Sequence, residues 1–74
     1  MTLEQARHSA TARGYHSVLN FLGNASPLAN LTERFPGEWS IQYHTIGARE
    51  FAVLQERYDR PIGAHLWESY TLLP

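Results

Sequence analysis

The sequence contains no cysteine and no lysine, and it has one methionine among its 74 residues. Without cysteine, neither a disulfide nor a cysteine-based metal site can stabilise so short a chain. A domain of this size buries only about 60% of the surface that its unfolded chain exposes. Stability must come from one hydrophobic core, so we expect a single domain over residues 1–74. A homodimer would extend that core.

Long apolar runs and clusters of one charge are also absent. No stretch approaches the roughly 20 apolar residues of a membrane helix, and the N-terminus does not resemble a signal peptide. All six basic residues are arginines, interspersed among seven acidic residues for a formal net charge of −1. Because there is no basic stripe, the sequence does not favour direct nucleic-acid binding. We therefore expect a cytoplasmic protein that contacts no membrane.

Apolar spacing at the start of the chain predicts a helix over about residues 3–22. Thr2 and Gln5 have the spacing of a capping box at its beginning. Gly14 is a point where this helix would break or kink, and Gly23 fits its end. The positions that follow the i, i+3, i+4, i+7 spacing of one helix face are Tyr15, Val18, Leu19 and Leu22.

A second, shorter helix is predicted after Ser26. This residue has the type preferred at an N-cap, and Pro27 follows it at the position where proline is favoured in a helix. The apolar residues of this helix are Leu28, Leu31 and Phe35, and Pro36-Gly37 ends it.

From residue 38 the apolar period changes from 3.6 to 2, which predicts three β-strands. We expect them at about 39–44, 50–57 and 62–70, with turns at 47–48 and 58–61 and a tail after residue 70. The expected fold class is α+β, with two N-terminal helices packed on a three-stranded antiparallel sheet (ααβββ).

No catalytic or metal-binding constellation is evident in the sequence. The four histidines lack the convergent spacing that a zinc site needs. There is no nucleophile-elbow motif and no glycine-rich phosphate loop. Glu56 and Glu68 are expected to lie near each other on adjacent strands, as charges on a solvated face. We therefore predict no catalytic residue, no metal site and no cofactor.

Aromatic residues are concentrated in the half of the chain that forms the sheet. Two short helices cover one face, so we expect Phe51, Val53 and Trp67 on the other, where an apolar surface indicates a partner site or a dimer seam. Trp, Tyr and Arg dominate the binding energy of protein interfaces. The predicted contact residues are Trp39, Tyr43, Arg49, Phe51, Arg57 and Trp67.

These observations favour a small, non-catalytic protein-binding module that forms a homodimer and binds another protein or protein complex. Its expected role is that of an inhibitor or regulator. Compact, cysteine-free, slightly acidic domains of this size occur among phage and mobile-element antagonists of host systems, such as anti-CRISPR proteins. By this analogy, the partner would be a host protein complex.

Two segments together resemble a known family and provide an alternative hypothesis. "ASPLANL" (25–31) and "FAVLQERYDRPIGAHLWESY" (51–70) are similar to the N-terminal half of the toxin-activating lysine acyltransferases, the haemolysin-activating family, which resemble GNAT acyltransferases in fold. The resemblance implies a minimal or degenerate acyltransferase, whose fold begins with the ααβββ order expected here. If the chain is an active enzyme, His44 or His65 would have to serve as the base. Ala29 stands where the family has its catalytic histidine, and alanine cannot accept a proton. A counterpart of the acyl-donor half is also missing.

Overall fold

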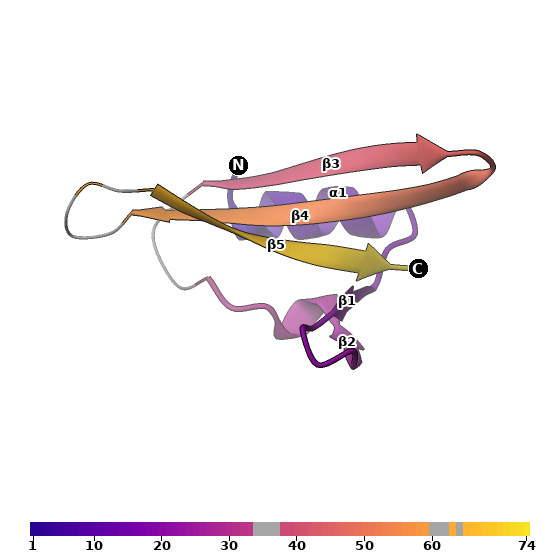
Figure 1. Ribbon diagram of the computed structural model, residues 1–74, viewed down its shortest axis with the longest axis horizontal. Helices are drawn as coiled ribbons and strands as arrows, with labels where there is room; N and C mark the ends of the chain where they lie inside the picture. The colour runs from indigo at the N-terminus through magenta and orange to yellow at the C-terminus, as the bar shows by residue number, and fades with distance from the viewer. Residues whose placement is uncertain (34–37, 60–62, 64) are drawn as a thin grey trace.

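The structure, a computed structural model, describes residues 1–33, 38–59, 63 and 65–74, and only the backbone of residues 58, 59 and 65. Its elements are α1 (Leu3–Ala12), β1 (Ser17–Leu19), β2 (Ala25–Pro27), the 3-10 turn η1 (Leu28–Asn30), β3 (Trp39–Ile46), β4 (Arg49–Asp59) and β5 (His65–Leu73) (Figure 1). The strands form one antiparallel sheet in the order β2-β1-β5-β4-β3.

The expected fold class is therefore wrong in its elements. Across the described part of the chain, one α-helix accompanies a five-stranded sheet, where two helices on three strands were predicted. The ααβββ order that the acyltransferase resemblance implied is not present. The described helices also include none long and apolar enough to cross a membrane.

Helix α1 begins as the sequence predicts. The Thr2 hydroxyl accepts a hydrogen bond from the backbone N–H of Gln5 (3.2 Å), and the Gln5 side chain accepts one from the N–H of Thr2 (2.9 Å). These reciprocal bonds satisfy two donors that the first helical turn leaves without partners. The face of α1 that packs on the sheet consists of Leu3, Ala6 and Ala10.

Helix α1 ends at Ala12, well before the predicted end near residue 22. Gly14 has a φ of +93°, and its N–H donates to the carbonyl of Thr11 (3.0 Å). The N–H of Tyr15 donates to the carbonyl of Ala10 (3.0 Å). These two bonds form a Schellman motif, in which a left-handed residue terminates the helix. Gly14 is therefore the helix stop and not a kink within a longer helix.

A short hairpin takes the place of the last part of the predicted first helix. Strand β1 pairs with β2 on one side and with β5 on the other. The Asn20 side chain holds the turn, because its Oδ1 accepts from the N–H groups of Leu22 (3.0 Å) and Asn24 (2.9 Å). Tyr15 and Val18 are both buried, so their apolar character indicated burial correctly although their spacing suggested the wrong element.

The second predicted helix is reduced to the single turn η1. Pro27 has extended backbone angles (φ −57°, ψ 140°) and ends β2, so Ser26 is a strand residue and not an N-cap. The N–H of Leu28 donates to the carbonyl of His16 (2.8 Å), which ties this segment to the residue before β1. Phe35 and the predicted stop at residues 36–37 lie outside the described residues.

The three predicted strands are confirmed as β3, β4 and β5, but each differs in its boundaries. The turn at Gly47-Ala48 is confirmed, and Gly47 has the positive φ (+60°) that a tight turn favours. Residues 58–59, predicted as turn, belong to β4, and residues 60–61 lie outside the described ones. Residues 71–73, predicted as tail, complete β5 and pair with β1.

The hydrophobic core lies between α1 and one face of the sheet. In β4, which lies between β5 and β3, Ala52 and Leu54 are fully buried on this side, whereas Phe51 and Val53 are only partly buried. Successive strand residues point to opposite faces, so the predicted separation of these two pairs is confirmed. Leu72, directly opposite Ala52, adds the contribution of β5 to the core.

Because Gly14 ends helix α1 in a left-handed conformation, substitutions at this position should lower the free energy of unfolding by different amounts. A Cβ added there would meet no atom within 4 Å, so the cost of Gly14→Ala comes from the positive φ alone. We expect the free energy of unfolding to fall by about 1–2 kcal/mol for alanine, and by clearly less for Gly14→Asn, because asparagine tolerates this conformation. Urea denaturation measures both changes. Equal losses for the two variants would show that Gly14 is not held in the left-handed region.

Candidate functional site

The face of the sheet that points away from α1, here called the open face, is the main candidate surface. Its residues are identified by the pairing register, because residues directly opposite each other in neighbouring strands share a face. One row crosses all five strands and consists of Gln42, Val53, Thr71, Leu19 and Ala25. No described helix covers this row (Figure 1), so its apolar members lie at the surface of the domain.

An apolar patch occupies the part of the open face next to the Gly47 turn. Phe51 and Val53 are half-buried, and the Phe51 ring stacks on the ring of His44, directly opposite in β3, with centroids 5.0 Å apart. Leu19 of β1 and Ile46 at the end of β3 extend this surface and are exposed. The patch therefore combines aromatic and aliphatic groups, and no helix in the described part of the chain covers it.

Trp67 forms a second patch towards the opposite end of the open face. Half of its surface is exposed (50%), and it lies directly opposite Arg57 of β4. Arg57 also approaches Glu38, with 3.8 Å between Nη1 and Oε2. A polar row separates the two patches, in which Gln55 Nε2 donates to Ser69 Oγ (3.0 Å). Trp67 and Arg57 thus present the two residue types that most often anchor protein interfaces.

The six predicted contact residues are divided between the two faces of the sheet. Four of them share the open face, and these are Arg49, Phe51, Arg57 and Trp67. Trp39 lies on the helix side, only 1% exposed, and stacks on Tyr70 with ring centroids 5.9 Å apart. Tyr43 is also on the helix side, where its hydroxyl is 2.8 Å from Ser9 Oγ. Trp39 and Tyr43 therefore belong to the packing between helix and sheet.

Glu56 and Glu68 lie directly opposite each other, as predicted, but on the buried side of the sheet. Glu56 is fully buried, so the interpretation as charges on a solvated face is wrong for it. The Tyr70 hydroxyl is 2.8 Å from Glu68 Oε2 and 3.1 Å from Glu56 Oε2, and its single hydrogen can bond one of them at a time. Among the residues described, no group of three or more potential metal ligands occurs.

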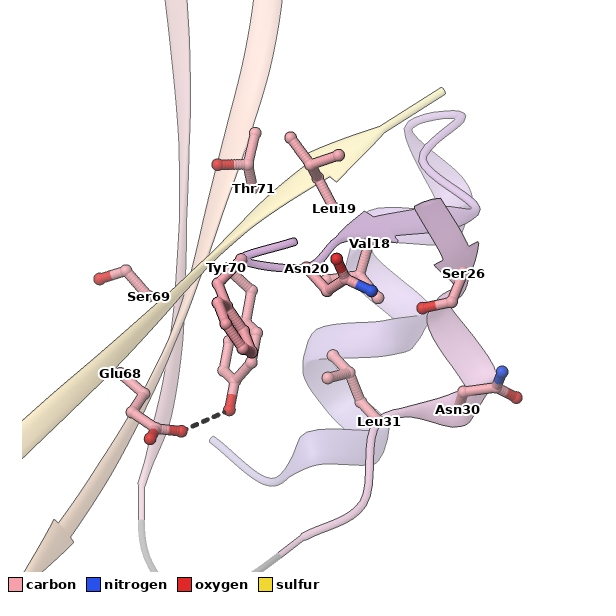
Figure 2. A pocket seen from close by; sticks show the side chains of 11 residues that line it. Val18, Leu19, Asn20, Ser26, Asn30, Leu31, Glu68, Ser69, Tyr70 and Thr71 are labelled. Atoms are coloured by element: carbon pink, nitrogen blue, oxygen red, sulfur yellow. Dashed lines mark hydrogen bonds between the residues drawn. The ribbon is translucent and has the colours of Figure 1, made fainter. Parts of the chain in front are cut away.

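A groove of about 720 Å³ runs beside β5, at the point where β1 ends (Figure 2). Figure 2 shows Tyr70 and Glu68 on one side of it and Leu31, Asn30 and Ser26 on the other. Four of its polar residues come from β5, and the others, Asn20, Ser26 and Asn30, lie in the segment that runs from the end of β1 through β2 to η1. Within this groove, the Tyr70 hydroxyl is hydrogen-bonded to Glu68 of the same strand.

Sequence reasoning missed the apolar tip of the β1–β2 hairpin. Phe21 is 96% exposed and Leu22 is 70% exposed, whereas the sequence placed both in a helix and Leu22 on its apolar stripe. The signal that could have revealed the turn is Asn20 followed by Gly23-Asn24, since asparagine and glycine favour turn conformations. Phe21 also lines the groove beside β5.

A compact cluster at the end of α1 includes Tyr15, whose pKa is clearly displaced. Arg13 lies 3.9 Å above the centre of the Tyr43 ring and forms an ion pair with Glu50 (3.3 Å). The Tyr15 ring packs beside Tyr43 with centroids 6.0 Å apart. Burial raises the pKa of the Tyr15 phenol above its ordinary value of 10.0, Glu50 adds to this rise, and Arg13 opposes it.

The raised pKa of Tyr15 predicts a loss of stability in alkaline solution. The folded state favours the neutral phenol, so this contribution is fully present below pH 10.0 and is lost as the pH rises through the folded-state pKa. We expect Tyr15→Phe to reduce the fall in the free energy of unfolding above that pH. Urea denaturation at a series of pH values across this range measures that fall. The chain has no lysine and no cysteine, whose side chains would otherwise titrate in the same range. An unchanged pH dependence in the variant would contradict this assignment.

Comparisons with known proteins add no further constraint on this site. The chain matches no protein-family model, no curated protein and no solved structure. The acyltransferase resemblance therefore stays a prediction. The candidate surface is defined by the exposure, register and charge of the chain's own residues.

Proposed function

We propose that this chain is a non-catalytic protein-binding module whose contact surface is the open face. The observation that carries the proposal is the half-exposed Trp67 directly opposite Arg57, on a face that no described helix covers. A buried tryptophan would serve the core, as Trp39 does. An exposed one beside an arginine has the character of an interface anchor.

The chemistry of the open face suggests the kind of partner that it fits. Phe51, Val53 and Leu19 offer apolar area, while Arg49 and Arg57 offer guanidinium groups at its two ends. We infer a protein partner whose surface combines an apolar patch with carboxylates, because guanidinium pairs with carboxylate through two parallel hydrogen bonds. The polar row around Gln55 and Ser69 would lie between the Phe51 patch and the Trp67 patch.

The role that we propose is inhibition or regulation of a cytoplasmic protein complex. A domain of 74 residues that binds through one sheet face can act by occupying a surface that another molecule needs. The carboxylates of Glu56 and Glu68 both approach the Tyr70 hydroxyl, and a structural hydrogen bond accounts for this arrangement without a catalytic role. Ala29, in the position of the acyltransferase histidine, lies exposed in the turn η1.

A photo-crosslinking amino acid at position 67 tests the proposal directly. The variant is exposed to lysate of cells that naturally contain the chain, with the same amino acid at Thr11, an exposed helix residue, as the control. We expect one protein to be captured from position 67 and not from position 11. Once this protein is purified, Trp67→Ala should weaken its binding by about 2 kcal/mol or more, roughly 30-fold, as measured by titration calorimetry.

Leu22→Ala is the matched control for the affinity measurement. Leu22 is a large exposed apolar residue at the hairpin tip. Its truncation shows how much affinity is lost when apolar surface is removed away from the open face. We expect its effect on binding to be small. Equal losses for the two variants, or equal capture from positions 67 and 11, would refute the open face as the contact surface.

A further inference from the structure

Strand β3 forms one margin of the sheet and lacks the devices that normally protect a sheet edge. Its eight residues, Trp39–Ile46, pair with β4 in an uninterrupted register, so no bulge twists the edge away. The strand contains no charged residue, no proline and no glycine. Natural edge strands use charge, proline or bulges to avoid pairing with other chains. The opposite margin, β2, has only three residues.

The direction of the β3 backbone groups follows from two observed contacts. The Glu38 carbonyl accepts from the N–H of Arg57 (2.8 Å), so the backbone of Glu38 points towards β4. Alternate residues of a strand point their backbone groups to opposite sides, so those of Trp39 point outward. The exchange of two bonds between Trp39 and Met1 confirms this, with the Trp39 N–H donating to Met1 O (2.9 Å) and the Met1 amine donating to Trp39 O (3.0 Å).

The same alternation leaves three consecutive outward positions beyond the Met1 contact, namely Ile41, Tyr43 and Thr45. Their backbone N–H and carbonyl groups have no partner among the residues that the structure describes. Figure 1 shows β3 at the margin, with α1 against the face of the sheet and not beyond this edge. A row of unpaired groups of this kind is a template for one more strand.

We propose that this β3 edge binds the β3 edge of a second copy of the chain, antiparallel and with two-fold symmetry. The register that uses all three free positions places Tyr43 opposite its counterpart and Ile41 opposite Thr45 of the second copy. Each such pair exchanges two backbone hydrogen bonds. The two sheets then join into one continuous sheet across the seam.

The length of the free edge supports a second copy as the occupant. In this register, the turn that begins at Gly47 of the second copy comes level with Trp39, where Met1 already occupies the edge. The incoming β3 therefore ends where the free stretch ends. No like charges face each other, and on the open side Gln42 lies opposite His44 of the second copy, so two hydrogen-bonding side chains meet.

The proposed seam keeps the open face accessible and doubles it. A two-fold axis perpendicular to the sheet puts both open faces on one side of the dimer and both helices on the other. The two Trp67 patches would then be presented to a partner together, and two linked sites bind a repeated or extended partner more tightly than one. The dimer itself does not depend on partner binding by the open face.

Analytical ultracentrifugation of the full chain over a wide concentration series tests the seam. We expect association that increases with concentration and is modest in strength, because pairing of one strand edge buries less than the roughly 1,200 Å² of a standard interface. Thr45→Pro removes an outward N–H and no bond of the β3–β4 ladder, so it should weaken association at least tenfold without unfolding the domain. Thr45→Ala keeps the N–H and should associate like the wild type.

Amide hydrogen exchange gives a second measurement that needs no variant. We expect the amides of Ile41, Tyr43 and Thr45 to exchange fast in dilute solution and markedly more slowly at high concentration. Trp67→Ala should leave association unchanged, which separates this seam from the proposed partner surface. A chain that stays monomeric at every concentration overturns the proposal. The proposal is also overturned if Thr45→Pro associates like the wild type, or if Trp67→Ala is the variant that loses association while Thr45→Pro keeps it.

Discussion

One short helix has to cover a five-stranded sheet, and the rest of the structure depends on this constraint. The ten residues of α1 span about 15 Å, whereas the eleven residues of β4 span about 37 Å. Helix α1 can therefore bury one face of the sheet and only part of its length. Leu54, Ala52 and Trp39 are buried under that cover. Among the residues that the structure describes, no helix covers the apolar residues of the other face, so they lie at the surface.

The two proposed surfaces lie at right angles and serve different purposes. The open face presents side chains, with Trp67 and Phe51 as its aromatic members, and under our proposal it would select a partner by shape and charge. The β3 edge presents backbone groups and selects a strand by register. Because backbone and side-chain directions in a strand are perpendicular, pairing at the edge does not obstruct the face. Under these two proposals, the module would dimerise and bind a partner at the same time.

Features set by neighbouring residues could be predicted from the sequence, and features set by distant contacts could not. The capping box of Thr2 and Gln5, the turn at Gly47 and the alternation within β4 are local, and the structure has all three. The extent of the first helix was wrong because Val18 is buried by strand pairing with Leu72, far along the chain. For the candidate site, alternation placed Phe51 and Val53 correctly. It could not show which face α1 covers, so Trp39 was expected at an interface although it is buried.

The central claim is that α1 covers one face of the sheet and leaves the other face open. The two tryptophans test it, because Trp39 lies beneath the helix and Trp67 lies on the open face. Fluorescence quenching by iodide, a charged quencher that does not enter protein cores, distinguishes the two environments. We predict that about half of the emission is quenched in the wild type and that Trp67→Phe leaves emission that iodide barely quenches. Trp39→Phe, which keeps Trp67 exposed, should leave emission that is fully accessible to the quencher. If Trp67 resists quenching as strongly as Trp39 does in dilute solution, the sheet has no open face and the account is wrong.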